Sequence, residues 1–130
     1  MKNLEVVGAV IVVDGLVLCA QRGEDGPLAS KWEFPGGKIE DGEAAPDALT
    51  REIREELRCE VVVGEHVATT TYKYDFAVVT LATFYCSLAG GSPSITEHHD
   101  LRWLEPSEMA QLDWAPADIP AVEKIQMDFR

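Results

Sequence analysis

The chain has 130 residues, of which 46% are hydrophobic and 26% charged, and its formal net charge is −12 at pH 7. A chain of this length builds one hydrophobic core, so we expect a single domain over residues 1–130. The negative charge argues against binding to nucleic-acid polymers or to anionic membranes, because Lys and Arg supply most contacts to phosphate backbones.

Cysteine usage and hydropathy indicate a cellular compartment. Cys19, Cys59 and Cys86 are odd in number, form no Cys-x-x-Cys pair and lie in apolar runs, so we expect buried, reduced thiols. The longest apolar run, residues 6–13, is much shorter than the about 20 residues of a membrane span. The N-terminus shows no signal-peptide pattern. We therefore predict a cytoplasmic protein.

The first predicted element is a β-hairpin. Residues 4–13 are almost continuously apolar and rich in Val and Ile, which is typical of a strand buried on both faces. Asp14-Gly15 is a type I′ turn signal, so residues 16–22 form the returning strand. A polar loop follows, and residues 32–34 then predict a short strand that leads into a Gly-rich turn.

A helix is expected over residues 46–57. Leu49, Ile53 and Leu57 recur at four-residue spacing and form one apolar ridge, while Pro46 suits a first helical turn. This ridge predicts a helix that packs on the sheet.

Three carboxylates of this helix share a second face. Glu52, Glu55 and Glu56 are spaced i, i+3 and i+4, and each like-charged pair costs a helix roughly 0.2–0.5 kcal/mol. A hard divalent cation such as Mg²⁺ takes carboxylate oxygens as ligands and removes that repulsion. Taken alone, the pattern also describes a solvated acidic face.

The second half of the chain predicts further strands and a terminal helix. Strands are expected at residues 60–63, 67–76, 78–88 and 101–104, and helices at 106–112 and 119–129. Asp118 is placed as the N-cap of the terminal helix. Strands on both sides of a central helix, followed by a terminal helix, predict an α/β fold, an α/β/α sandwich around a central mixed β-sheet.

The spacing of residues around the central helix carries a family resemblance. Gly37, then Glu43, then Arg51-Glu52-Ile53-x-Glu55-Glu56 resembles the signature of the Nudix hydrolases, here residues 37–59. The resemblance implies the same α/β/α sandwich. Arg58 stands where the family usually has Gly, which suits a left-handed helix C-cap, so this departure concerns the cap and leaves the carboxylates intact.

Divalent-metal chemistry follows from the resemblance. It implies a site for Mg²⁺, with Mn²⁺ as an alternative, and the metal and catalytic residues expected are Gly36, through its carbonyl, with Glu52, Glu55, Glu56 and Glu97. Glu97 and Glu52 both remain candidates for the general base. Arg51 is interpreted as an orienting residue that reaches Glu55 or Glu43. His98 and His99 are interpreted as loop residues, since adjacent histidines do not readily chelate one ion.

Four further residues are candidates for substrate binding. Arg22 and Lys38 are candidate phosphate ligands, although Arg22 also suits a solvated strand end. Phe34 is a candidate for stacking on the base. By resemblance to MutT-like enzymes, Asp118 faces the nucleobase, and an ionised carboxylate there would accept the 4-amino group of cytosine.

Several shorter motifs are similar to the CTP pyrophosphohydrolase branch of the family. They are Glu5-Val6-Val7, Ala20-Gln21-Arg22, Trp32-Glu33-Phe34, Glu97-His98 and Trp114–Pro120. The resemblance implies hydrolysis of nucleoside triphosphates to monophosphate and diphosphate, with cytosine nucleotides preferred. Two alternatives remain, namely an 8-oxo-dGTP diphosphatase and a non-catalytic nucleotide sensor. A monomer or a homodimer is expected, acting on nucleotides and not on nucleic acid.

Overall fold

The computed structural model describes residues 1–129 and is organised around one long strand. Seven strands are present in the described chain: β1 (Asn3–Val13), β2 (Leu16–Gln21), β3 (Trp32–Glu33), β4 (Gly36–Lys38), β5 (Glu60–Lys73), β6 (Val78–Gly90) and β7 (Asp100–Leu104). The helical elements are α1 (Ala45–Leu57), α2 (Ile119–Asp128) and the 3₁₀ turns η1 (Pro106–Gln111) and η2 (Pro116–Asp118).

The sheet is mixed, as predicted. Its strand order is β3-β2-β1-β6-β5, with β4 paired to β1 and β7 paired to β2. β1 runs parallel to β6, whereas the other named strand pairs are antiparallel. The parallel pair is possible because a long connection that contains α1 separates its two strands in the sequence.

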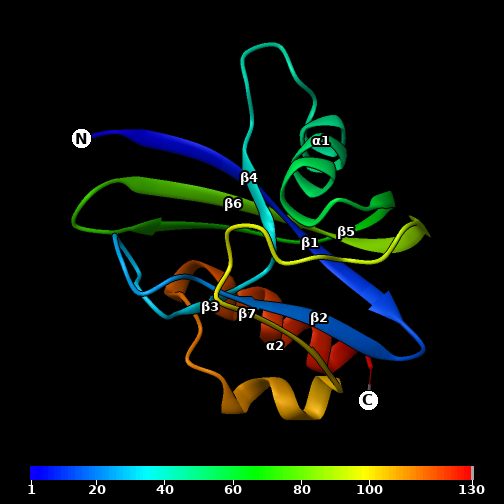
Figure 1. Cartoon of the computed structure of the whole chain (residues 1–130). Helices are drawn as coiled ribbons and strands as arrows, with labels where there is room; N and C mark the ends of the chain where they lie inside the picture. Colours follow the sequence, from blue (N-terminus) through cyan, green and yellow to red (C-terminus); the bar gives the residue numbers. More distant parts are fainter. Residues whose placement is uncertain (130) are drawn as a thin grey trace.

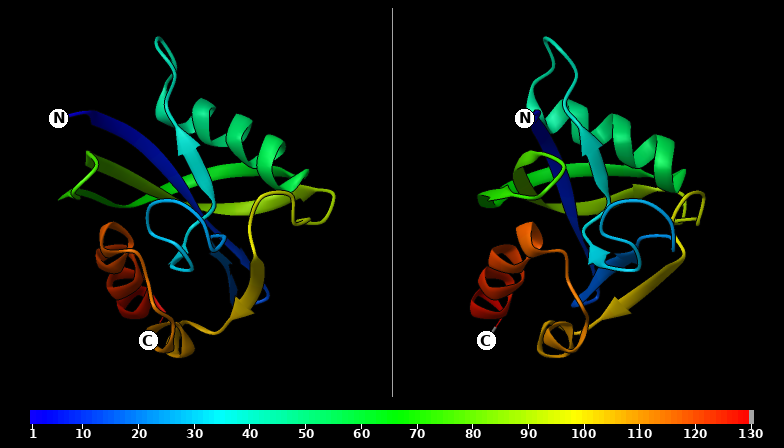
Figure 2. Two further views of the ribbon diagram at one scale, coloured as in Figure 1. Left: turned by 60° about the vertical axis from the view of Figure 1, so that its left-hand side comes forward. Right: turned by 90° about the vertical axis from the view of Figure 1, so that its left-hand side faces the viewer.

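Helices cover both faces of this sheet. Figures 1 and 2 show α1 on one side and α2 on the other, with the strands between them. The alternation of side chains along β1 explains the two cores, because Val7 and Ile11 pack with α1 whereas Val10 packs with α2. The α/β/α sandwich expected from the sequence is therefore confirmed.

The Leu49–Ile53–Leu57 ridge of α1 is fully buried, as its spacing predicts. The helix ends at Arg58, whose φ of 56° and ψ of 35° place it in the left-handed region. Its backbone N–H donates to the carbonyl of Arg54. The αL cap thus forms even though a Gly is absent.

The structure differs from the sequence expectations in three elements. Residues 36–38 form the short strand β4, where a turn alone was expected. β5 is one strand where two were expected, and register shifts between Val63 and Ala68 mark the expected break. Bulges of this kind insert an extra residue without ending the strand. A short helix was expected over residues 106–112. The structure has the 3₁₀ turn η1 there instead.

Two smaller observations complete the fold. Cys19, Cys59 and Cys86 are free and buried, as expected. Within residues 1–129, no helix is both long enough and apolar enough to cross a membrane.

Candidate active site

Two glycines of β4 bring the backbone close to its neighbours. A Cβ atom on Gly36 would lie 1.9 Å from the carbonyl oxygen of Val7, and one on Gly37 would lie 2.3 Å from the carboxyl carbon of Glu52. Neither position has room for a side chain. The carboxylate of Glu52 therefore packs directly against the main chain of Gly37.

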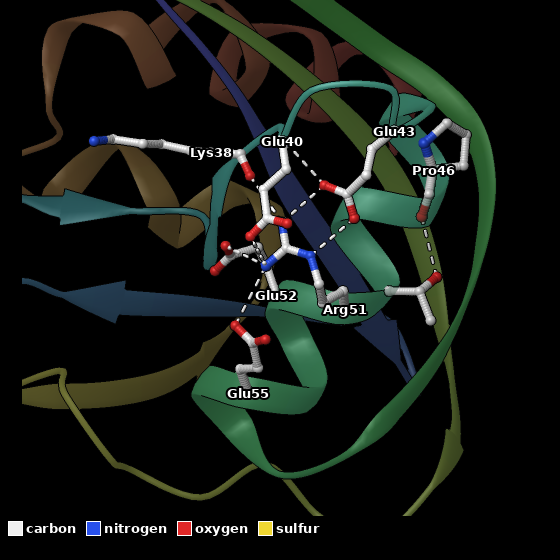
Figure 3. A network of polar contacts seen from close by, with 8 residues as sticks. Lys38, Glu40, Glu43, Pro46, Arg51, Glu52 and Glu55 are labelled. Atoms are coloured by element: carbon white, nitrogen blue, oxygen red, sulfur yellow. Dashed lines mark hydrogen bonds and ion pairs between the residues drawn. The ribbon is translucent and has the colours of Figure 1, made fainter.

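The guanidinium of Arg51 holds the carboxylates of this region in place (Figure 3). Its Nε and Nη2 donate to the two carboxylate oxygens of Glu43 at 2.8 and 2.9 Å, and Nη2 also donates to the Lys38 carbonyl at 3.0 Å. Nη1 donates to Glu52 at 2.9 Å and to Glu55 at 3.3 Å. The predicted reach of Arg51 to Glu43 and Glu55 is confirmed.

The bond to Arg51 changes the ionisation of Glu43. Hydrogen bonding to this guanidinium, followed by the backbone N–H of Glu40, lowers the pKa of the Glu43 carboxyl to about 2. Glu43 is therefore ionised throughout the neutral range. It ties the loop before α1 to the first turns of the helix.

Glu56 is the most unusual carboxylate of the site. Burial raises its pKa to about 7, the negative charges of Glu33 and Glu52 add to that effect, and His98 opposes it. Its Oε2 atom is buried and has no hydrogen-bond partner within residues 1–129. Burial also raises the pKa of Glu52, against the opposing bond from Arg51. An unpaired carboxylate oxygen beside other carboxylates fits a divalent cation.

The three carboxylates of α1 do not converge as a ready ligand cluster. Glu52 and Glu55 both bond to Arg51, and the side chain of Glu55 is 60% exposed. Among residues 1–129, no three His, Cys, Asp or Glu side chains are gathered closely enough to hold a metal ion. The unpaired oxygen of Glu56 is therefore the local feature that best fits a cation.

Two cavities meet beside Glu56. One, of about 290 Å³, is largely apolar; the predicted site residues that line it are Arg22, Phe34, Gly36, Lys38, Glu56 and Asp118. The other, of about 280 Å³, is acidic; its lining includes Arg22, Glu24, Asp25, Glu33, Glu56 and Glu97. Arg22, Glu33 and Glu56 line both, so the two cavities adjoin at these residues.

Asp118 is buried and occupies the N-cap position of α2. Its Oδ1 accepts the backbone N–H of Phe34 at 3.0 Å, and its side chain makes no capping hydrogen bond to α2. The predicted N-cap position is confirmed, but the predicted capping hydrogen bond is absent, because Asp118 ends the 3₁₀ turn η2 and has helical φ and ψ of −86° and −18°. An N-cap side chain folds back from an extended backbone. Burial raises the pKa of Asp118 well above its usual range.

Aromatic residues form the walls around Asp118. The ring of Phe34 is buried with its centroid 4.8 Å from that of Trp114. Tyr74, which the sequence analysis did not assign to the site, lines the same cavity and accepts the backbone N–H of Ala117 at 2.8 Å. The alternation of aromatic residues at positions 72, 74 and 76 was the sequence pattern that could have identified Tyr74 as a site residue.

Glu33 and His98 are also site residues that sequence reasoning left without a role. Glu33 lies in β3, and His98 lies in the loop before β7, where it is buried. Both line the acidic cavity. Their meeting depends on residues far apart in the chain, although the polar centre of Trp32-Glu33-Phe34 was a local signal.

The acidic cavity beside the apolar one offers carboxylates that could hold a divalent cation near an apolar group, as metal-assisted hydrolysis of a phosphate anhydride requires. The comparisons with known proteins agree, since the NUDIX domain family matches residues 6–124. The chain is 42% identical over 123 residues to a CTP pyrophosphohydrolase of Escherichia coli K12, covering 95% of this chain and 91% of that protein. It is 28% identical over 130 residues to the 8-oxo-dGTP diphosphatase of the same strain, covering 97% and 98% respectively.

A solved structure extends this agreement to three dimensions. The solution structure of a protein described as DNA mismatch repair protein MutT, of the Nudix hydrolase family, from methicillin-resistant Staphylococcus aureus 252 superposes with a TM-score of 0.81 and 51% identity. The match covers 98% of this chain and 99% of that one. The chain belongs to the Nudix hydrolase family. It is a nucleotide pyrophosphohydrolase by fold and family, and the enzyme interpretation is confirmed.

Proposed function

We propose that this enzyme hydrolyses nucleoside triphosphates to a monophosphate and diphosphate with Mg²⁺, and that it prefers cytosine nucleotides. One observation carries the proposal: a buried carboxylate, Asp118, lines an apolar cavity that adjoins an acidic one. Its relative named CTP pyrophosphohydrolase supports the same substrate class.

The adjoining cavities support an orientation for the substrate. The base occupies the apolar cavity between Phe34 and Asp118, and the triphosphate passes Arg22 toward Glu56 and Glu97. Arg22 stands where the two cavities meet and suits the bidentate geometry of a phosphate. Lys38 adds a second cation at the rim. These cations offset part of the negative charge of the site.

The metal-binding proposal rests on oxygen donors of α1 and its neighbours. Glu52, Glu55, Glu56, Glu97 and the carbonyl of Gly36 would hold the ion, and Nudix hydrolases generally use divalent metals such as Mg²⁺. When bound, the ion neutralises phosphoryl oxygens and activates water. The protein's own part is to orient these donors and to accept the proton of the attacking water, for which Glu97 and Glu52 are the candidates.

Asp118 supports discrimination between bases. An ionised carboxylate only accepts hydrogen bonds, and the 4-amino group of cytosine donates one. Uracil and guanine present an acceptor oxygen at the corresponding edge. One matched contact of this kind is worth about 1–3 kcal/mol of discrimination. Adenine also carries an amino group, so the size of the cavity must reject it.

A second candidate substrate, 8-oxo-dGTP, is favoured by the ionisation of the same residue. Burial raises the pKa of Asp118 well above its usual range, which favours the protonated acid. A protonated carboxyl donates a hydrogen bond, so it tolerates an acceptor oxygen. The relative named 8-oxo-dGTP diphosphatase supports this alternative.

Steady-state kinetics with Mg²⁺ would test the proposal. We would measure kcat/KM for dCTP, 5-methyl-dCTP, dGTP, 8-oxo-dGTP and ADP-ribose, expecting dCTP to exceed dGTP by about tenfold, which equals one matched contact. Asp118→Asn should lower this ratio by about tenfold. The preference for dCTP over 8-oxo-dGTP should rise with pH as Asp118 ionises. Equal rates for dCTP and dGTP, or a ratio unchanged in Asp118→Asn, would contradict the cytosine assignment.

A further inference from the structure

Three side chains from separate segments form one hydrogen-bonded chain between the cavities. Arg22 Nη1 donates to Glu33 Oε1 at 3.0 Å, and His98 Nε2 lies 3.0 Å from Glu33 Oε2. Each oxygen of Glu33 thus has its own partner. Exposure falls along the chain, from 37% for the Arg22 side chain to 20% for Glu33 and 5% for His98.

The loop that carries His98 is itself anchored at both sides. The hydroxyl of Thr96 donates to the carbonyl of Glu56 in α1, and the backbone N–H of His99 donates to the carbonyl of Gln21 in β2. His98 is therefore held between the helix of carboxylates and the strand that leads to Arg22. Its position is set by a hydrogen bond on either side, one from the Thr96 side chain and one from the His99 backbone.

The His98 ring has Glu33 as its only hydrogen-bond partner within residues 1–129. Its Nδ1 is buried and has no hydrogen-bond partner within residues 1–129. Leaving a buried polar atom unpaired costs about 1–3 kcal/mol. An apolar side chain of similar size would fill the space without that cost, so packing does not explain the imidazole. Its bond to Glu33 does.

Arg22 gains a fixed direction from this arrangement. Only Nη1 of its guanidinium has a protein partner within the described chain, so Nη2 and Nε remain available. A carboxylate bonded at one oxygen can rotate, whereas one bonded at both cannot. Restricting Glu33 therefore restricts the guanidinium that it holds, which lowers the entropic cost of binding a phosphate.

We propose that His98 is a positioning residue, which locks Glu33 so that Arg22 presents its free N–H groups to the substrate's phosphates. The inference rests on the phosphate role of Arg22 given under the proposed function. It is independent of the base that the enzyme prefers, because the contact involves phosphate only.

A set of five variants tests the proposal at saturating Mg²⁺, with kcat and KM measured for both dCTP and dGTP. His98→Leu removes the donor, while His98→Gln keeps an N–H that reaches Glu33. His99→Leu is the matched control on the exposed neighbouring position. Arg22→Met and the double variant Arg22→Met/His98→Leu complete a double-mutant cycle.

We expect His98→Leu to raise KM about tenfold for both nucleotides, with kcat changed less than threefold. The KM of His98→Gln should stay within threefold of the parental KM. His99→Leu should have the parental KM. In the Arg22→Met background, His98→Leu should change KM less than twofold. The melting temperature should change little in His98→Leu, because the variant loses the bond to Glu33 but also removes an unpaired buried nitrogen. Should that variant not fold, His98→Asn, whose amide is too short to reach Glu33, should show the same rise in KM.

Several results would overturn the inference. A parental KM in His98→Leu, an additive effect in the double variant, or a loss confined to kcat would each exclude positioning through Arg22. A parental KM in Arg22→Met would instead overturn the phosphate role of Arg22 itself. A raised KM in Arg22→Met with a parental KM in His98→Leu overturns the present inference alone.

Discussion

The carboxylate of Asp118 and the backbone N–H of Phe34 are joined by a hydrogen bond of 3.0 Å between residues 84 positions apart. This bond ties the start of α2 to the segment between β3 and β4. It also places a buried acid beside the wall of the apolar cavity. Because burial opposes the charged form more than this bond supports it, ionisation of Asp118 lowers the stability of the folded protein.

Asp118→Asn should stabilise the protein at neutral pH. The folded-state pKa of Asp118 lies above the ordinary value of 3.8, so the folded protein binds more protons than the unfolded chain over that interval. Stability therefore falls as pH rises above 3.8. Asn cannot ionise, and its Oδ1 still accepts the Phe34 N–H.

Thermal unfolding without nucleotide would check the direction of this change in stability with pH. The melting temperature of Asp118→Asn should equal that of the parent below pH 4 and exceed it at pH 7. Asp41→Asn, at an exposed loop position, is the control and should show no such divergence. A lower melting temperature for Asp118→Asn at pH 7 would contradict the account.

Glu56→Gln should separate stability from activity. Burial raises the pKa of Glu56 to about 7, above the ordinary 4.5, so stability is lost as pH rises between these two values. In EDTA, the variant should melt at a higher temperature than the parent at pH 8 and at the same temperature near pH 4. Its turnover should fall by more than about 100-fold, since a metal donor is gone.

The response to metal gives the second measurement for Glu56→Gln. Mg²⁺ should raise the melting temperature of the parent and raise that of the variant much less. Glu123→Gln, on the exposed surface of α2, should behave as the parent in both respects. Near-parental turnover of Glu56→Gln at saturating Mg²⁺ would contradict the metal-site proposal.

The fold was predictable where local pattern and geometry coincide. The Asp14-Gly15 turn has positive φ at both residues, as a type I′ turn requires, and the apolar ridge of α1 is buried. β4 was missed because Gly36–Lys38 is short and carries no apolar alternation. The expected break in β5 fell near Gly64, where the register shifts but the strand continues.

The site was predictable only in part, because its remaining contacts join distant segments. Glu52, Glu55 and Glu56 share a helix, so spacing alone identifies them. The bond between Glu33 and His98 joins residues 65 positions apart, and no local sequence pattern predicts it. Asp118 was expected to be an N-cap, since a cap is the local role that Asp most often takes at a helix start.

Arg58→Gly should stabilise the protein by about 1 kcal/mol, the lower end of the cost of a left-handed conformation for a residue with a Cβ atom. Arg58 has a φ of 56° at the end of α1, and no side-chain bond of Arg58 is present within residues 1–129. Urea unfolding would measure the gain. Asp14→Gly is a matched control with a φ of 51°, where the gain should be smaller because Asp tolerates this region. Equal or lower stability of Arg58→Gly would show that other contacts offset the strain.

The identity of the general base is the last prediction. Glu97 is exposed, lines the acidic cavity and makes no side-chain hydrogen bond within residues 1–129. Glu52 is half-buried, and one of its oxygens accepts a bond from Arg51 at 2.9 Å, which reduces its freedom to approach a water. Glu97 is therefore the better placed of the two to accept a proton.

Glu97→Gln should lower kcat by about 10²–10⁴, the range for a lost general base. Glu24→Gln is the control, because Glu24 lines the same cavity without an assigned role, and it should change kcat less than twofold. A loss below about threefold in Glu97→Gln would move the role to Glu52. In that case Glu52→Gln should itself lower kcat by about 10²–10⁴, although the bond from Arg51 at 2.9 Å would remain available to the amide oxygen.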